Sequence, residues 1–220
     1  MPAPRGWRIC RRHGDVLDLY AEPYDPARPV VCLDEKPVTL HADVSPSLSV
    51  RPGAPARSDY EYVRCGTANL FVCIEPLRGY RHLAVTDRRT KQDYTQVIKW
   101  LVDDAYPEVE VIRLVQDNLN THLPGSPYDA FEAAGARRLL WKLEFRYTPV
   151  RGSRLNFIEI EIAVIGRECL RRRAGDRATL EKQVAALRAD RNQQQRTITW
   201  SFTAYDARTK LRRLYPIPQS

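Results

Sequence analysis

Short apolar runs rich in β-branched residues recur along the chain, each bounded by Pro, Gly, Asp or other turn-forming residues. Runs of this length and composition are typical of buried β-strands. They predict strands at residues 30–34, 60–63, 69–74, 82–85, 111–116 and 143–147. Pro76 and Gly79 separate two neighbouring runs, so we expect the second to fourth strands to be consecutive and antiparallel. The polar stretch after residue 34 is expected to be a loop or an irregular hairpin.

Apolar residues at helical spacing occupy segments that lie between the later strands. Thr90, with Asp93 three residues on, forms a variant of the capping box, and the apolar face that follows ends before Pro107. A second helix is expected to begin at Ser126, because proline at the next position favours the first helical turn. We expect Gly135 to interrupt it before a second short helix.

Two further helices are predicted in the last third of the chain. Residues 156–173 begin with an alternation that a strand would also show, but the length of the segment favours a helix. Asp176 is expected to cap the next helix, and the tail at 197–215 is expected to hold a short basic helix. The predicted order of strands and helices is a mixed-sheet α/β layout.

Composition places the chain among soluble globular proteins. Its 220 residues, 43% hydrophobic and 28% charged, allow one sizeable core. No apolar run approaches the roughly 18 residues that cross a bilayer, and the first residues lack the apolar core of a signal peptide. We therefore expect a cytoplasmic protein with no membrane partner. The five cysteines include no close pair, which argues against a zinc knuckle and a disulfide framework.

Positive charge is concentrated in one segment. The net charge is +8, and residues 137–173 hold ten Arg or Lys against four Glu. A surplus this local favours a polyanionic partner, with nucleic acid as the first candidate.

Acidic residues at the ends of predicted elements are candidates for chemistry. Asp34 and Asp117 each follow an apolar run, at the strand ends where open α/β sheets bind ligands. Glu159 or Glu161 would add a third carboxylate from the first turn of a helix. Such a set can hold two Mg²⁺ ions roughly 4 Å apart, and without metal the carboxylates would repel one another. Spacing alone leaves open that these acids only form turns.

Several longer motifs occur in a fixed order. They are Cys32-Leu33-Asp34-Glu35-Lys36, Tyr60-Glu61-Tyr62-Val63-Arg64-Cys65-Gly66-Thr67, Gln116-Asp117-Asn118-Leu119-Asn120-Thr121-His122, Leu155-Asn156-Phe157-Ile158-Glu159, and a tail from Phe202 to Pro216. Together they closely resemble the catalytic domain of bacterial mariner-like insertion-sequence transposases, over about residues 15–216. The resemblance implies a ribonuclease H-like mixed sheet flanked by helices. It also implies a DDE-type endonuclease that uses two Mg²⁺ ions, or Mn²⁺ in their place, to cleave transposon ends and join them to target DNA.

The resemblance also implies the site residues. By motif match the catalytic, metal-binding acids are Asp34, Asp117 and Glu159, with Glu161 less favoured because the family's Glu lies three residues after the motif's Asn. Asn118, Asn120 and His122 either orient a phosphate or ligand near the second acid or only order a turn. The arginines expected to contact DNA phosphates are Arg151, Arg154, Arg171, Arg172 and Arg173.

Two departures from the family pattern support an alternative function. Family members usually begin with helix-turn-helix domains, for which this chain has no room, so we expect residues 1–25 to be an arm or linker remnant and 26–216 the catalytic domain. Arg154 stands where the family usually has Trp. The alternative is an impaired remnant that binds DNA non-specifically or inhibits transposition. Expected partners are transposon ends, target duplex, and a second copy or a longer transposase chain, in association with the nucleoid.

Overall fold

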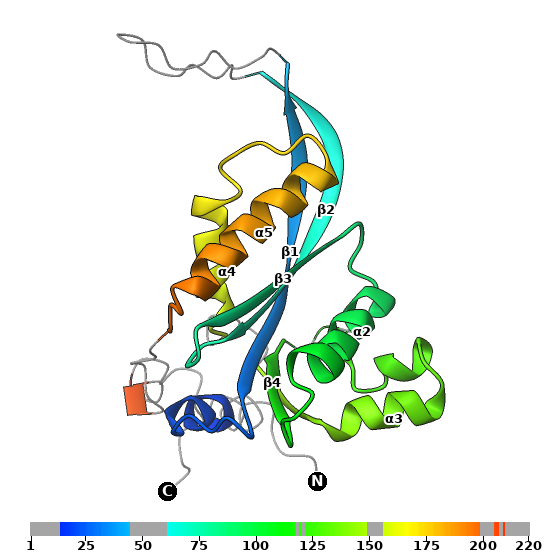
Figure 1. Cartoon of the computed structure of the whole chain (residues 1–220), viewed down its shortest axis with the longest axis vertical. Helices are drawn as coiled ribbons and strands as arrows, with labels where there is room; N and C mark the ends of the chain where they lie inside the picture. Colours follow the sequence, from blue (N-terminus) through cyan, green and yellow to red (C-terminus); the bar gives the residue numbers. More distant parts are fainter. Residues whose placement is uncertain are drawn as a thin grey trace, which may run out of the picture.

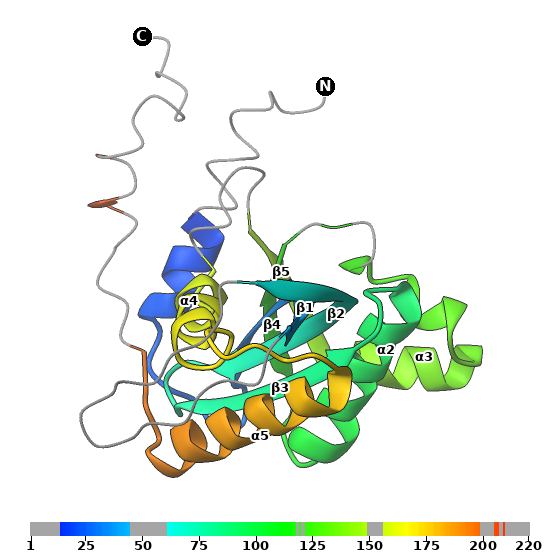
Figure 2. The same cartoon turned by 90° about the horizontal axis from the view of Figure 1, so that it is seen from above.

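A five-stranded mixed sheet forms the centre of the protein (Figures 1 and 2). The computed structural model describes residues 14–44, 61–117, 119, 122–148, 156–198, 205, 206 and 209. In spatial order the strands are β3 (Tyr80–Thr86), β2 (Tyr62–Glu75), β1 (Val30–Asp43), β4 (Ile112–Gln116) and β5 (Leu143–Tyr147). The first three pair antiparallel, whereas β4 pairs parallel with both β1 and β5. This is the ribonuclease H-like mixed sheet that the motifs imply.

β1 and β2 are much longer than the apolar runs predict. The first strand was predicted to end at Asp34, but β1 continues to Asp43, and β2 joins the predicted strands at 60–63 and 69–74 into one. The paired strands extend beyond the rest of the sheet as a two-stranded arm (Figure 1). Pro37 is tolerated within β1 because β4 ends before this point and leaves one side of β1 without a neighbouring strand.

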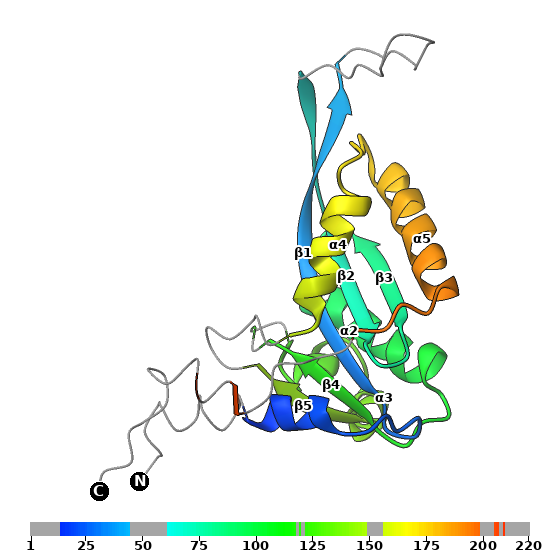
Figure 3. The ribbon, with the colours of Figure 1, turned by 90° about the vertical axis from the view of Figure 1, so that its left-hand side faces the viewer.

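Helices cover both faces of the sheet (Figures 2 and 3). The helices α2 (Lys91–Trp100), η1 (Leu101–Ala105, a π-helix) and α3 (Ala133–Trp141) lie on one face, and α4 (Ile158–Glu168) and α5 (Arg177–Gln193) lie on the other. Successive residues of β1 alternate between two hydrophobic cores. Val31 and Leu33 belong to the core under α2, and Cys32 belongs to the core under α4 and α5.

Two predicted helix starts are confirmed together with their caps. The Thr90 side chain accepts a hydrogen bond from the Asp93 amide, and the Asp93 carboxylate accepts one from the Thr90 amide. Asp176 caps α5 by accepting a hydrogen bond of 2.7 Å from the Thr179 amide. Each cap satisfies amides that have no partner within the helix itself.

Other helix boundaries differ from the prediction. The segment at Ser126–Asp129 is a short 3₁₀-helix, η3, and the residues between it and the start of α3 at Ala133 are not helical. Gly135, the predicted interruption, lies inside α3. The helix predicted at 156–173 is confirmed as a helix, but α4 ends at Glu168 because the following residues turn the chain toward α5.

Part of the predicted N-terminal arm contributes to the core. Residues 14–21 are helical, and the side chains of Val16, Leu17 and Leu19 are buried. Two of these, Val16 and Leu19, pack in the core under α4 and α5. Residues 1–13, the predicted loop at 149–153 and most of the predicted tail lie outside the described residues. No helix in the described part of the chain has the length and apolar character that crossing a membrane requires.

A buried ion triad ties α4 to β3 and α5. The Glu161 carboxylate lies 2.8 Å from Arg81 Nε and 2.9 Å from Arg191 Nε. Glu161 and Arg81 are fully buried, and Arg191 is nearly so. A charge withdrawn from water needs an opposite charge nearby, so each member of this triad depends on the others.

We predict that Glu161→Ala lowers the free energy of unfolding by about 3–5 kcal/mol, the usual cost of leaving a buried charge unpaired. Urea denaturation followed by circular dichroism measures this loss. The matched control is Glu168→Ala, which removes a half-exposed carboxylate 3.7 Å from the same Arg191 and should cost less than about 1 kcal/mol. Equal losses in the two variants would contradict the assigned role of the triad.

Candidate functional site

The parallel register of β1 and β4 determines where the first two acids lie. Val30 is opposite Arg113, and Cys32 is opposite Val115. Continued by two residues, this register places Asp34 beside Asp117, the residue that follows β4. Asp34 was expected at the end of a strand, and this was wrong, because β1 continues past it. The edge of the sheet is formed instead by the end of β4, next to the middle of β1.

Asp34 is partly buried among other carboxylates. One of its oxygens, Oδ1, accepts a hydrogen bond of 2.8 Å from the Glu35 amide. Burial raises the pKa of Asp34 to about 7, and the negative charges of Asp117, Glu35 and Glu159 add to the increase against the lowering effect of that hydrogen bond. Asp34 therefore interacts electrostatically with both of the other acids predicted from the motifs.

Asn156 positions the start of α4, which carries the predicted third acid, against β1. Its side-chain amide donates a hydrogen bond of 3.3 Å to the Leu33 carbonyl, and its Oδ1 accepts one from the Ile158 amide. Asn156 is buried, so the start of α4 is fixed against β1 one residue before Asp34. Glu159 follows in the first turn of α4 with an exposed side chain. Sequence analysis included Asn156 in a motif but did not identify this contact.

Glu161, the less favoured third acid, is engaged elsewhere. Its carboxylate is buried between Arg81 and Arg191 on the α5 side of the sheet. Glu159 therefore remains the prediction for the third acid.

His122 connects Asp117 to a second buried acid. Nδ1 of the ring lies 2.6 Å from Asp117 Oδ1, and Nε2 lies 2.7 Å from Glu35 Oε1. The side chains of His122 and Glu35 are 0% and 1% exposed. Burial of the ring opposes protonation, but the hydrogen bonds and charges of Asp117 and Glu35 outweigh it and raise the pKa of His122 to about 9. Each nitrogen of the ring therefore has a carboxylate partner.

Polar groups from β4, β5 and α2 fix the backbone around His122. Gln116 Nε2 donates a hydrogen bond of 3.0 Å to the His122 carbonyl, and the Tyr147 hydroxyl donates one of 3.2 Å to the same oxygen. The Tyr94 hydroxyl in turn donates to Gln116 Oε1 at 2.9 Å. The His122 backbone is thus held in place relative to β4 and β5. Asn118 and Asn120 are outside the described residues.

The donor chemistry at this edge fits a hard divalent cation. Asp34, Asp117 and Glu159 supply only carboxylate oxygens, the ligands that Mg²⁺ and Mn²⁺ prefer. The raised pKa of Asp34 shows that negative charge there is unfavourable without a cation. Among the described residues, no three His, Cys, Asp or Glu side chains already stand close enough together to hold a metal.

The arginines predicted to contact DNA fall into three groups. Arg151 and Arg154 lie outside the described residues, whereas Arg171 and Arg172 are exposed after α4. Arg173 is already engaged, because its guanidinium lies 2.5 Å from Asp43 Oδ1 and over the Tyr62 ring. Arg173 therefore helps to fasten the chain after α4 to the two-stranded arm.

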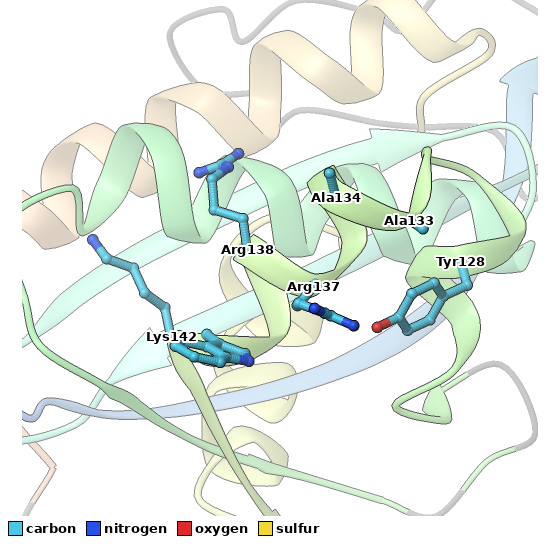
Figure 4. Close-up of a pocket in the computed structure, with 7 residues that line it drawn as sticks. Tyr128, Ala133, Ala134, Arg137, Arg138 and Lys142 are labelled. Carbon is cyan, nitrogen blue, oxygen red and sulfur yellow. The ribbon is translucent and has the colours of Figure 1, made fainter.

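A surface pocket on α3 and η3 is separate from the acids. Figure 4 shows Arg137 pointing toward Tyr128, and Arg138 and Lys142 pointing away from it. Arg138 pairs with Asp103 at 2.6 Å. The residues that line the pocket include no carboxylate, so it lacks the chemistry of the sheet edge; they are Tyr128, Ala133, Ala134, Arg137, Arg138, Trp141 and Lys142.

Comparison with known proteins gives one family and one group of structures. Residues 29–181 match the family described as DDE superfamily endonuclease. No curated protein sequence matches the chain. The catalytic domain of Mos1 mariner transposase superposes with a TM-score of 0.54 at 14% identity, covering 89% of this chain and 88% of that chain.

Two Mos1 complexes show the same fold. The Mos1 strand transfer complex gives a TM-score of 0.60 at 14% identity and covers 99% of this chain and 64% of that chain. The Mos1 mariner paired end complex with Mn gives 0.53 at 17% identity, with 89% and 59% covered. The chain thus spans about six tenths of the length of the Mos1 chains in these complexes.

We predict that Asp34→Asn stabilises the metal-free protein at alkaline pH. The carboxyl pKa is near 3.8 in the unfolded chain and about 7 in the folded one, so the folded state binds more protons between these values. Stability contributed by Asp34 therefore falls as pH rises from about 4 to 7, and Asn removes this loss.

Thermal unfolding in EDTA measures the effect. At pH 8 the Tm of the variant should be several degrees above that of the unaltered chain, since each kcal/mol shifts a chain of this size by roughly 2–4 °C. The difference should shrink toward pH 4. A Tm difference that does not change with pH would show that the Asp34 carboxylate is not penalised in the folded protein.

Proposed function

Because the chain belongs to the DDE superfamily endonucleases, we propose that Asp34, Asp117 and Glu159 form one metal-dependent site for DNA cleavage. The observation that carries this proposal is the register of β1 and β4, which places Asp34 beside Asp117, while Asn156 fixes the start of α4, the helix that carries Glu159, against β1. Within this proposal the chain acts as a transposase catalytic domain, which cuts transposon ends and joins them to target DNA. The resemblance to the Mos1 paired end complex and the Mos1 strand transfer complex supports this finer assignment.

The acids would hold two Mg²⁺ ions, or Mn²⁺ in their place. Asp34 interacts with both other acids, so in this proposal it would contribute to both ions, with Asp117 completing one position and Glu159 the other. When bound, such ions lower the pKa of a coordinated water and stabilise charge on the attacking and leaving oxygens of a phosphodiester. The residues of the chain orient the carboxylates: Asn156 fixes the start of α4, and His122 holds one oxygen of Asp117.

DNA would contact the basic surface that follows α4. Arg171 and Arg172 are exposed there, and phosphate contacts of this kind give affinity without sequence choice. The proposed DNA partners are transposon ends and target duplex. A second copy of the chain or a longer transposase chain would assemble with it, as the paired-end names of the Mos1 structures suggest. The proposed location is the cytoplasm, in association with the nucleoid.

Single replacements of the three acids test the proposed chemistry. We expect Asp34→Asn, Asp117→Asn and Glu159→Gln each to reduce Mn²⁺-dependent nicking of DNA by more than the roughly 100-fold that loss of a supporting group costs. Each variant removes a charged ligand while keeping its size. Nicking of a supercoiled plasmid and of a pre-nicked transposon end measures the loss.

The control for these variants is Glu168→Gln, an exposed carboxylate on the same helix as Glu159, which should nick DNA as the unaltered chain does. Nicking that persists in Asp117→Asn would contradict the assignment. An unaltered chain that binds DNA but nicks none with either metal would favour the alternative function, a DNA-binding remnant or inhibitor.

Replacement of Arg171 and Arg172 by Ala tests the DNA surface. The two changes should weaken binding about equally for all sequences and reduce the slope of log K against log salt by about 0.9 for each phosphate that is no longer neutralised. Fluorescence anisotropy on inverted-repeat and scrambled duplexes across several salt concentrations measures both effects.

The matched control removes two exposed lysines, Lys91 and Lys99, from α2 on the opposite face of the sheet. It changes net charge equally and should leave the salt slope close to that of the unaltered chain. If the two double variants weaken binding to the same extent, the surface after α4 has no special role in DNA binding.

A further inference from the structure

We propose that Glu35 is a positioning residue for the second acid, and that it acts through His122 to hold Asp117 in the orientation that binds a divalent cation. This inference rests on the proposed function, because it concerns the same site. It gives a supporting role to Glu35, which is not one of the three predicted metal-binding acids.

The contacts form one continuous chain of hydrogen bonds. Glu35 Oε1 lies 2.7 Å from His122 Nε2, and His122 Nδ1 lies 2.6 Å from Asp117 Oδ1. Such short distances are typical of hydrogen bonds between charged partners. The two ends of the chain belong to different strands, since Glu35 lies in β1 and Asp117 follows β4. The imidazole therefore links β1 to the residue that follows β4, next to the predicted metal ligand Asp117.

Glu35 lies on the face of β1 opposite Asp34. Side chains alternate along a strand, and Val31 and Leu33 belong to the core under α2. Glu35 continues this face, which agrees with the position of the Tyr94 ring of α2 near His122, at 4.8 Å between centroids. Asp34 points to the other side of the strand, where it interacts with Glu159 of α4. Glu35 therefore contacts the proposed metal site through the His122 ring.

Burial makes Glu35 dependent on His122. Its side chain is 1% exposed, and its second oxygen, Oε2, has no hydrogen-bond partner within the described part of the chain. A buried carboxylate with one oxygen unpaired is costly, and groups of this kind in folded proteins call for a functional explanation. Fixing the His122 ring supplies that explanation, because the ring is held from both of its nitrogens.

The consequence for Asp117 is a fixed carboxylate. With Oδ1 bound by His122, the side chain cannot rotate freely, and Oδ2 is directed away from the ring. Asp117 has a side chain that is 29% exposed, so without this contact it would sample several orientations. Groups that orient metal ligands in this way usually change metal affinity or activity by 10–100-fold when they are removed.

Mn²⁺ binding to the full chain without DNA tests the proposal. The electron paramagnetic resonance signal of free Mn²⁺ gives the dissociation constant, independently of any cleavage. We expect Glu35→Gln, which keeps the shape and loses the charge, to raise the Kd about tenfold. Glu35→Leu, which also loses the acceptor, should raise it further, toward roughly 100-fold. The matched control is Glu75→Gln, a buried acid bonded to the Tyr106 hydroxyl at 2.8 Å, which should leave the Kd unchanged.

A double-mutant cycle separates positioning from simple loss of negative charge. In a His122→Asn background the link between Glu35 and Asp117 is already broken. Glu35→Gln should then change the Kd by less than about twofold, because coupled residues act together. A through-space effect of the Glu35 charge would persist in that background, and this additive outcome would overturn the proposal.

Each remaining outcome of the Mn²⁺ titrations also supports or overturns the proposed role of Glu35. If Glu35→Gln and Glu35→Leu both bind Mn²⁺ within about twofold of the unaltered chain, the proposal is wrong while the proposed function stands. Should the leucine variant fail to fold, as judged by circular dichroism, the Kd of the glutamine variant alone supports or overturns the proposal. The proposed function requires that the unaltered chain binds Mn²⁺ and that Asp34→Asn abolishes this binding. If either result is not found, the proposed function is overturned, and this inference with it.

Discussion

The parallel pairing of β1 with β4 is the constraint on which the site depends. It covers only Val30 to Cys32 of β1, and then β4 ends while β1 continues with β2 as its neighbour. The end of β4 therefore leaves an open edge beside the middle of β1, with Asp34 next to Asp117. A shift of one residue in this register would turn Asp34 toward the opposite face of the sheet. The two hydrophobic cores fix the register, because alternate residues of β1 must enter opposite cores.

The unfavourable burial of negative charge at this edge is opposed by hydrogen bonds and ion pairs that hold the surrounding elements in place. Burial raises the pKa of Asp34, and the negative charges of Asp117, Glu35 and Glu159 add to the increase, so the ionised carboxylate is disfavoured in the metal-free fold. Buried contacts nearby hold the acids in place despite this repulsion. Asn156 fixes α4 against β1, and His122 fixes Asp117 against Glu35. The Glu161 triad stabilises the same helix from its other side, by pairing with arginines of β3 and α5.

Local signals explain which parts of the fold were predictable from the sequence. β4, β5 and the caps at Thr90 and Asp176 follow from short-range patterns of β-branched residues and capping side chains. The length of β1 does not, because its second half begins at Pro37 and holds no continuous apolar run; it is a strand through pairing with β2. Ordered motifs predicted the three acids, but the register of the sheet was needed to place Asp34 beside Asp117.

Long-range contacts account for what sequence reasoning missed at the site. No local pattern around Glu35 indicates its partner, because His122 is 87 residues away. Arg173 was expected to face DNA from a basic run, yet Asp43, 130 residues earlier in the chain, holds it. No pattern within a short window distinguishes such residues from solvated surface charges. Only the pairing of distant segments brings their partners to them.

The most direct test of the central claim is the position of bound Mn²⁺ in a crystal, measured by anomalous scattering. If the three acids form one site, anomalous peaks will lie between Asp34 and Asp117 and between Asp34 and Glu159, and both will disappear in the Asp34→Asn variant. Peaks that lie away from Asp34, or that remain after its replacement, would contradict the account.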